Sequence, residues 1–174
     1  QKAMTPDKPF MIYYAPGSVH APHHAPKSFI EKYKGKFDGG WDKYRNETFA
    51  RQKKMGVIPQ NAKLAPMPED IMEWETLGAD EKALYAPQIK TSAGFAEHTD
   101  LEVGRLVDAI DKLGALDNTL FIYIMGDNGS SGEGGLTGTY NELIHLNGIF
   151  DVETTESMLK RADDWGGPNS FPHF

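Results

Sequence analysis

The distribution of apolar and polar residues along this chain predicts two kinds of element: helices from a regular spacing of apolar side chains, and strands from short apolar runs. Between about Asp80 and Leu113 the apolar side chains recur at the spacing of one helix face, and Gly114 stands where that helix should end. Pro87 lies in the first turns of this helix or marks a break in it. The apolar positions that define the face are Val103, Leu106, Val107, Ile110 and Leu113.

Two shorter helices are expected upstream. The first begins after Pro26, and the second follows a Gly-Gly break and ends at Gly56. Residues 57–79 contain three prolines and little periodicity, so we expect them to run over the surface. The apolar faces comprise Phe29, Ile30 and Tyr33 in the first helix, and Trp41, Tyr44, Phe49 and Met55 in the second.

Residues 9–14 and 119–125 are short apolar runs rich in β-branched and aromatic side chains, which predicts two buried strands. Strands that alternate with helices indicate an α/β protein with a mostly parallel sheet flanked by helices. Two strands are too few for a complete sheet of this kind. Because the chain opens on Gln1 and closes on 165–174 without a final element, we expect residues 1–174 to form a single incomplete domain.

Composition narrows the range of partners. The 174 residues include 18 lysines and arginines against 25 acidic residues, a net charge of -7, and the basic residues are not clustered. This distribution predicts no nucleic-acid partner. No apolar stretch approaches the length that spans a bilayer, so no membrane partner is expected either. The chain has no cysteine, which excludes disulfides, zinc–thiolate sites and a cysteine nucleophile.

The turn that follows the second predicted strand carries Asp127 and Asn128 between Gly126 and Gly129. Ligands in open α/β sheets usually sit at the carboxyl ends of strands, and two adjacent oxygen donors favour Ca²⁺ or Mg²⁺. The same residue types also form turns for backbone reasons alone. The glycine-rich run that continues to Gly138 has neither the lysine of a phosphate-binding loop nor the spacing of a calcium-binding EF-hand loop.

Three histidines lie in a proline-punctuated loop after the first predicted strand: His20, His23 and His24. They could bind a transition metal together, although Pro22 and Pro26 hold this stretch extended and could separate the side chains. Alternatively, one of them serves as a proton or hydrogen-bond donor, or all three are incidental loop residues.

In combination, these segments resemble the interior of a bacterial arylsulfatase, a formylglycine-dependent member of the alkaline-phosphatase-like superfamily. Single segments are weak signals, whereas their order and spacing make the match specific over about Lys8 to Phe174. The segments that carry the resemblance are Lys8–Phe10, Tyr13–Pro16, His20–Pro26, Glu97–Asp100, Val103–Leu106, Leu116–Thr119, Gly126–Gly129, Glu133–Glu142 and Trp165–Pro168.

The resemblance implies a partial alkaline-phosphatase-like sandwich and hydrolysis of a small-molecule sulfate ester. It implies that Asp127 and Asn128 bind the divalent cation, usually Ca²⁺ with Mg²⁺ possible, and that His20 binds sulfate or protonates the departing alcohol. His23 and His24 are then bystanders. A hard cation acting on an anionic ester agrees with the chemistry of these residue types.

The chain departs from the family pattern at the nucleophile. The C/S-x-P-S/A-R motif that yields formylglycine is absent, and the family's other aspartates, lysines and histidine fall outside the match. We therefore predict that the isolated chain is catalytically silent, and that cut sheet edges promote self-association. The alternatives are a phosphodiesterase or phosphonate monoester hydrolase of the same superfamily, a non-catalytic binding or assembly module, and a metal protein built on the histidine loop.

Overall fold

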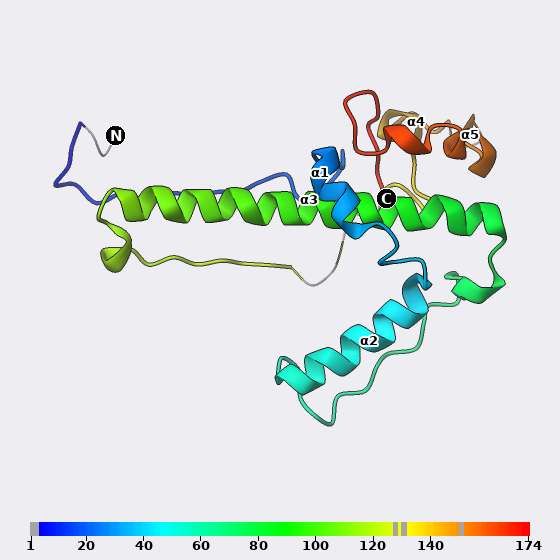
Figure 1. Ribbon diagram of the computed structural model, residues 1–174, viewed down its shortest axis with the longest axis horizontal. Coiled ribbons are helices and arrows are strands. Elements are labelled where there is room, and N and C mark those ends of the chain that lie inside the picture. The colour runs from blue at the N-terminus through cyan, green and yellow to red at the C-terminus, as the bar shows by residue number, and fades with distance from the viewer. Residues whose placement is uncertain (1–3, 127–128, 130–131, 150–151) are drawn as a thin grey trace.

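The computed structural model describes residues 4–126, 129, 132–149 and 152–174, and shows one long helix with smaller elements placed along it (Figure 1). The predicted ligands Asp127 and Asn128 lie outside the described residues. The α-helices are α1 (Lys27–Ile30), α2 (Gly40–Met55), α3 (Ala79–Lys112), α4 (Glu142–Leu146) and α5 (Thr155–Leu159), with short 3-10 turns at Glu31–Tyr33, Trp74–Thr76, Leu116–Asn118 and Ala162–Asp164.

Helix α3 confirms the strongest periodic signal in the sequence. It begins where the Glu81 carboxylate accepts a hydrogen bond from the Gly78 backbone N–H at 2.7 Å, and Gly114 follows its end with a φ of 64°. Pro87 lies inside the helix, so it does not break it. At 34 residues α3 is about 51 Å long. In the described ranges, no helix combines the length and the apolar character that a membrane span requires.

The N-terminal half of α3 forms the centre of the packing. Its buried positions Leu84, Gln88, Thr91 and Gly94 follow the three- and four-residue spacing of one helix face. At Gly94 a side chain is sterically excluded, because a Cβ there would lie 2.8 Å from both the Cα and the N of Ile30 in α1. Helices α1 and α3 therefore touch backbone to backbone at this point.

A small apolar core forms where α3 meets α5 and the C-terminal segment. Its buried members are Leu84, Tyr140, Met158 and Trp165, and Phe174 packs against them. The Tyr140 and Trp165 rings meet edge to face at 5.6 Å, and burial beside Asp164 raises the pKa of the Tyr140 phenol. Residues distant in sequence are thus joined through one face of α3.

Helix α2 and the 3-10 turn at Trp74–Thr76 pack together, at the lower right of Figure 1. The Trp41 and Trp74 rings lie 5.0 Å apart, and the Asp42 carboxylate accepts a hydrogen bond from the Trp74 backbone N–H at 2.8 Å. Gly56 ends α2 in the left-handed conformation, as the sequence predicts. Residues 57–73, between the two elements, are irregular apart from turns. The surface course predicted for 57–79 is wrong at its end, where Trp74 and Leu77 are buried.

The predicted α/β fold, a partial alkaline-phosphatase-like sandwich with a mostly parallel sheet, is wrong for this structure. The described residues form helices and no strand, and β pairing among them is limited to isolated bridges at Thr139–His173 and Asn141–Phe171. A strand requires a neighbour whose backbone groups complete its hydrogen bonds, and neither 9–14 nor 119–125 has one within the described ranges. Their apolar side chains are exposed instead, 90% at Met11 and 86% at Leu120.

Candidate functional site

Three segments far apart in sequence meet beside α3 and form the candidate site. The loop 17–25 donates two backbone hydrogen bonds to the C-terminal segment. The His23 N–H donates to the Pro172 carbonyl at 2.9 Å, and the Ala25 N–H donates to the Gly166 carbonyl at 3.2 Å. The loop 132–141 joins the same segment, since Thr139 N–H donates to the His173 carbonyl at 2.8 Å. The C-terminal segment therefore holds the two loops together.

His20, the predicted proton donor, stands at the exposed edge of this arrangement. Its side chain is 62% exposed, and its Nε2 lies 3.7 Å from a carboxylate oxygen of Glu133. Its Nδ1 lies 2.8 Å from the carbonyl oxygen of Ala21. Both ring nitrogens thus face oxygen acceptors, while the ring stays open to a small molecule arriving from solvent.

His23 lies at the opposite extreme, with no exposed surface. Its Nε2 is 3.0 Å from the Val19 carbonyl oxygen, and its Nδ1 accepts a hydrogen bond from the Phe174 backbone N–H at 3.4 Å. Burial lowers the pKa of His23 to about 4, because the buried ring lacks the water that would solvate its positive charge, and the hydrogen bond to Val19 opposes this only in part. His23 is therefore a neutral, structural histidine at neutral pH.

His24 points to a third partner, so the three histidines of the loop diverge. Its Nε2 lies 2.6 Å from the carbonyl oxygen of Ser170, and its ring is 5.9 Å from that of Phe171. Within the part of the chain that the structure describes, no group of three or more histidine, aspartate or glutamate side chains could hold a metal ion. The sequence alternative of a metal protein built on this loop finds no support there.

The histidine that sequence reasoning missed is His173. It is 4% exposed, with Nε2 3.4 Å from a Glu133 carboxylate oxygen and Nδ1 3.6 Å from a Glu142 carboxylate oxygen. Burial lowers the pKa of His173, and the carboxylates of Glu133 and Glu142 oppose that shift. No local pattern could have revealed it, because its partners lie 31 and 40 positions earlier in the chain.

We call the group formed by His20, Glu133, His173 and Glu142 the His20 cluster. Glu133 reaches it because the next residue is Gly134, where any Cβ would overlap the carbonyl oxygen of His173. Glycine at 134 thus lets the loop lie against the C-terminal segment. The glycine-rich run that the sequence analysis singled out therefore contributes close backbone packing in its described part.

Thr139 secures the base of the same loop. Its hydroxyl, fully buried, donates to the Glu153 carboxylate, which also accepts a hydrogen bond from the Tyr140 backbone N–H at 3.1 Å. Nearby, the Gln88 side-chain amide of α3 donates to the Thr137 carbonyl at 2.9 Å. These contacts fix the loop that carries Glu133 to the long helix.

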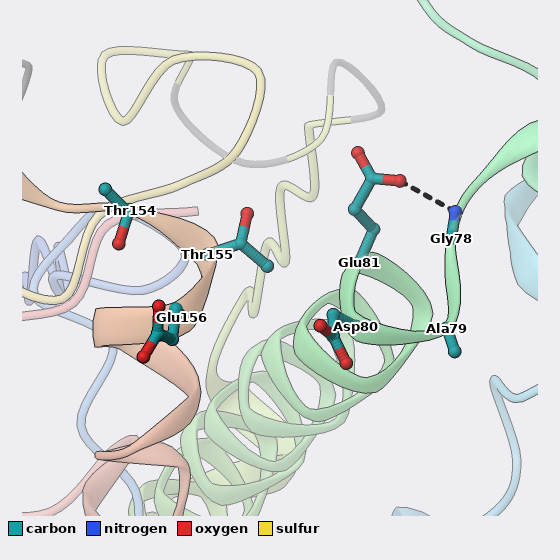
Figure 2. Close-up of a pocket in the computed structure, with 7 residues that line it drawn as sticks. All are labelled: Gly78, Ala79, Asp80, Glu81, Thr154, Thr155 and Glu156. Carbon is teal, nitrogen blue, oxygen red and sulfur yellow. Dashed lines mark hydrogen bonds between the residues drawn. The ribbon is translucent and has the colours of Figure 1, made fainter.

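A separate hollow of about 630 Å³ lies between the N-terminal ends of α3 and α5 (Figure 2). Figure 2 shows the hydrogen bond from Gly78 N–H to the Glu81 carboxylate at its edge. No member of the His20 cluster lines it, so it is not the candidate site. Its lining residues are Gly78, Ala79, Asp80, Glu81, Thr154, Thr155 and Glu156.

Comparison with known proteins identifies the family to which this chain belongs. The family model described as Sulfatase matches residues 1–162, and the chain belongs to the sulfatase family. This confirms the resemblance drawn from the sequence.

Two curated relatives make the similarity more particular. The chain is 36% identical over 126 residues to an uncharacterised sulfatase of Schizosaccharomyces pombe, an alignment that covers 71% of this chain and 22% of the relative. It is 27% identical over 130 residues to an arylsulfatase of Klebsiella aerogenes, covering 75% of this chain and 28% of the relative. The chain thus spans about a quarter of the length of these relatives.

Proposed function

We propose that this chain contributes to the hydrolysis of small-molecule sulfate esters, with His20 as the proton donor to the departing alcohol. The family match over residues 1–162 supports the reaction class. Similarity to an arylsulfatase supports aryl sulfates as the first substrates to test.

The observation that carries the proposal is the setting of His20. Cleavage of a sulfate ester leaves a negatively charged alcohol oxygen, which a positioned acid can protonate as the bond breaks. The ring of His20 is accessible, and in its charged form both N–H groups face acceptors, the Ala21 carbonyl and the Glu133 carboxylate. Donation from Nε2 to the alcohol oxygen leaves a neutral ring that still donates from Nδ1 to Ala21.

We also propose a divalent cation, and the basis for it is the chemistry of two side chains. Asp127 and Asn128 offer the carboxylate and amide oxygens that Ca²⁺ or Mg²⁺ prefers, and such a cation, when bound, stabilises negative charge on sulfate oxygens. The residues that the structure describes provide no further group of acidic and histidine ligands. Two protein oxygens fall short of the roughly six to eight that Ca²⁺ takes.

The nucleophile is absent from the 174 residues, since no cysteine and no C/S-x-P-S/A-R motif occurs in them. We therefore expect the isolated chain to be inactive. The purified chain should show no turnover of p-nitrophenyl sulfate with or without Ca²⁺. Turnover that depends on the metal would overturn the expectation of inactivity.

The reaction class is tested in a hybrid enzyme. Residues 1–162 of this chain, which the family model matches and which include His20, would replace the corresponding segment of the Klebsiella aerogenes arylsulfatase. A folded hybrid should hydrolyse p-nitrophenyl sulfate in preference to p-nitrophenyl phosphate and a phosphonate monoester. Preference for either phosphorus substrate would favour the alternative hydrolase of the same superfamily.

The role of His20 is tested in the same hybrid with two leaving groups. His20→Ala should lower kcat about 100- to 10,000-fold, the usual contribution of a general acid. The loss should be larger for phenyl sulfate than for p-nitrophenyl sulfate, because the more basic phenolate needs a proton more. His98→Ala, on α3 and outside the His20 cluster, is the matched control and should leave kcat unchanged. Equal losses for both substrates would rule out proton donation by His20.

A further inference from the structure

A row of alternating imidazole and carboxylate side chains leads from the exposed His20 to a buried histidine. Glu133 places one oxygen 3.7 Å from Nε2 of His20 and 3.4 Å from Nε2 of His173. Glu142 then lies 3.6 Å from Nδ1 of His173. The four side chains come from three segments of the sequence, so the fold alone brings them together.

We propose that Glu133 and His173 are positioning residues for His20. The shared Glu133 carboxylate fixes Nε2 as the ring nitrogen of His20 that carries the proton to be donated. The proposal deepens the proposed function and rests on it for the role of His20. It assigns to Glu133, His173 and Glu142 a part that neither the family match nor the relatives' descriptions contain.

His173 is the rigid member of the His20 cluster. Its side chain is 5% exposed and its backbone exchanges hydrogen bonds with Thr139 on both sides, at 2.8 and 3.0 Å. Both ring nitrogens face carboxylate oxygens, one from Glu133 and one from Glu142. A buried imidazole placed between two acceptors is held in one orientation, and it offers Glu133 a fixed partner.

Glu133 is held in place by the packing of its loop. Its side chain is 67% exposed, so burial does not restrain it. What restrains it is the backbone of the following residue, Gly134, which lies against the His173 carbonyl so closely that no side chain fits. The carboxylate therefore stands between the two imidazoles because the loop is packed onto His173.

Electrostatics also favours the contact between Glu133 and His20. A carboxylate only accepts hydrogen bonds, so its contact with Nε2 of His20 is attractive when that nitrogen carries a proton. Nδ1 of His20 faces the Ala21 carbonyl, also an acceptor only. The other charged groups that act on His173 are His20 and His145, and both oppose the two carboxylates. Around His173 there are thus two carboxylates that favour its protonated ring and two imidazoles that disfavour it.

The experiment uses the purified 174-residue chain with ¹⁵N-labelled histidine and follows the imidazole signals by long-range ¹H–¹⁵N NMR. Glu133→Gln should shift the ring signals of both His20 and His173, because each loses its carboxylate neighbour. Glu142→Gln should move the His173 signals and lower the pKa of His173. Since Glu133 is largely exposed, its variant should keep the amide spectrum of the folded chain, and Glu133→Asp provides a second, shortened side chain.

The matched control is Glu102→Gln. Glu102 lies 3.7 Å from Nε2 of His98 on α3, the same distance as the Glu133–His20 pair, but outside the cluster. This variant should shift His98 alone. If Glu133→Gln and Glu133→Asp leave the His20 ring signals as unchanged as Glu102→Gln does, the proposal is wrong. The measurement needs no turnover, so it stands apart from the assays that test sulfate-ester hydrolysis.

Discussion

The backbone N–H of Phe174 donates a hydrogen bond to Nδ1 of His23, across 151 positions of sequence. The other ring nitrogen lies 3.0 Å from the carbonyl oxygen of Val19, the residue before His20. His23 can serve both contacts only while its ring is neutral, with the proton on Nε2. A residue that resembles a bystander in the sequence is therefore one of the links between the loop 17–25 and the C-terminal segment.

The first prediction is loss of stability in acid. The pKa of His23 is about 4 in the folded chain and 6.5 at its ordinary value, so the unfolded state binds more protons between these two pH values. Stability should be fully present above about pH 6.5 and should fall as the pH drops toward 4. The loss attributable to His23 is about 3 kcal/mol. Urea unfolding at pH 7, 5.5 and 4 measures it.

His23→Gln is the control for this effect, since glutamine keeps a donor for Val19 but cannot titrate in this range. The variant should show a shallower fall in the free energy of unfolding from pH 7 to pH 4 than the parent chain. An identical pH dependence in the two proteins would show that other groups cause the acid instability.

The second prediction concerns Gly94. Gly94→Ala should destabilise the chain by about 1 to 3 kcal/mol, because the new methyl group meets the backbone of Ile30 at 2.8 Å. The higher helix propensity of alanine, worth about 1 kcal/mol, opposes this loss. Gly104→Ala is the matched control on the same helix, where nothing lies within 4 Å of the new atom. Thermal unfolding should place Gly94→Ala below the parent and Gly104→Ala above it.

The third prediction concerns the base of the glycine-rich loop. Thr139→Val removes a buried hydroxyl that donates to the Glu153 carboxylate and should cost about 1 to 3 kcal/mol of unfolding free energy. Thr99→Val removes a hydroxyl that donates to the Phe95 carbonyl within α3, and should cost less than Thr139→Val. Chemical denaturation compares the two. Equal losses would show that the Glu153 contact adds nothing beyond an ordinary helix-surface hydrogen bond.

The fourth prediction concerns self-association. Leu120, Ile122 and Ile124 are 86%, 70% and 85% exposed, and a run of exposed apolar side chains promotes association in water. The purified chain should form concentration-dependent oligomers in sedimentation velocity, and Ile122→Asp with Ile124→Asp should reduce them. Val57→Asp, outside this run and at a position that is 65% exposed, is the control and should not reduce them. A monomer at all concentrations would contradict the prediction.

Helices α1, α2 and α3 could be predicted because their signals are local, whereas the short helices α4 and α5 were not predicted. In the predicted face of α3, Val103 and Ile110 are buried, whereas Leu113 is 59% exposed. The glycines at 56 and 114 mark helix ends through their left-handed backbone. The strands could not, because an apolar run shows a preference for pairing and says nothing of whether a partner strand lies beside it. For 119–125 the described structure supplies no such partner.

The site divides in the same way. His20 is found from the family pattern around it, which is a matter of order and spacing. His173 and Glu133 are found only from the fold, because one glycine at 134 and one bridge at Thr139 bring them together. Asp127 and Asn128 stay predictions, since they lie outside the described residues.

The contact between Gly94 and Ile30 has a mechanical consequence. Turning α3 by a single residue would carry Gly94 about 100° away and drive a larger side chain into the backbone of α1. The close approach to Ile30 thereby prevents rotation of the long helix about its axis near its midpoint. The loop 17–25 ends one residue before α1, so the contact that holds α1 against α3 also limits where this loop can lie.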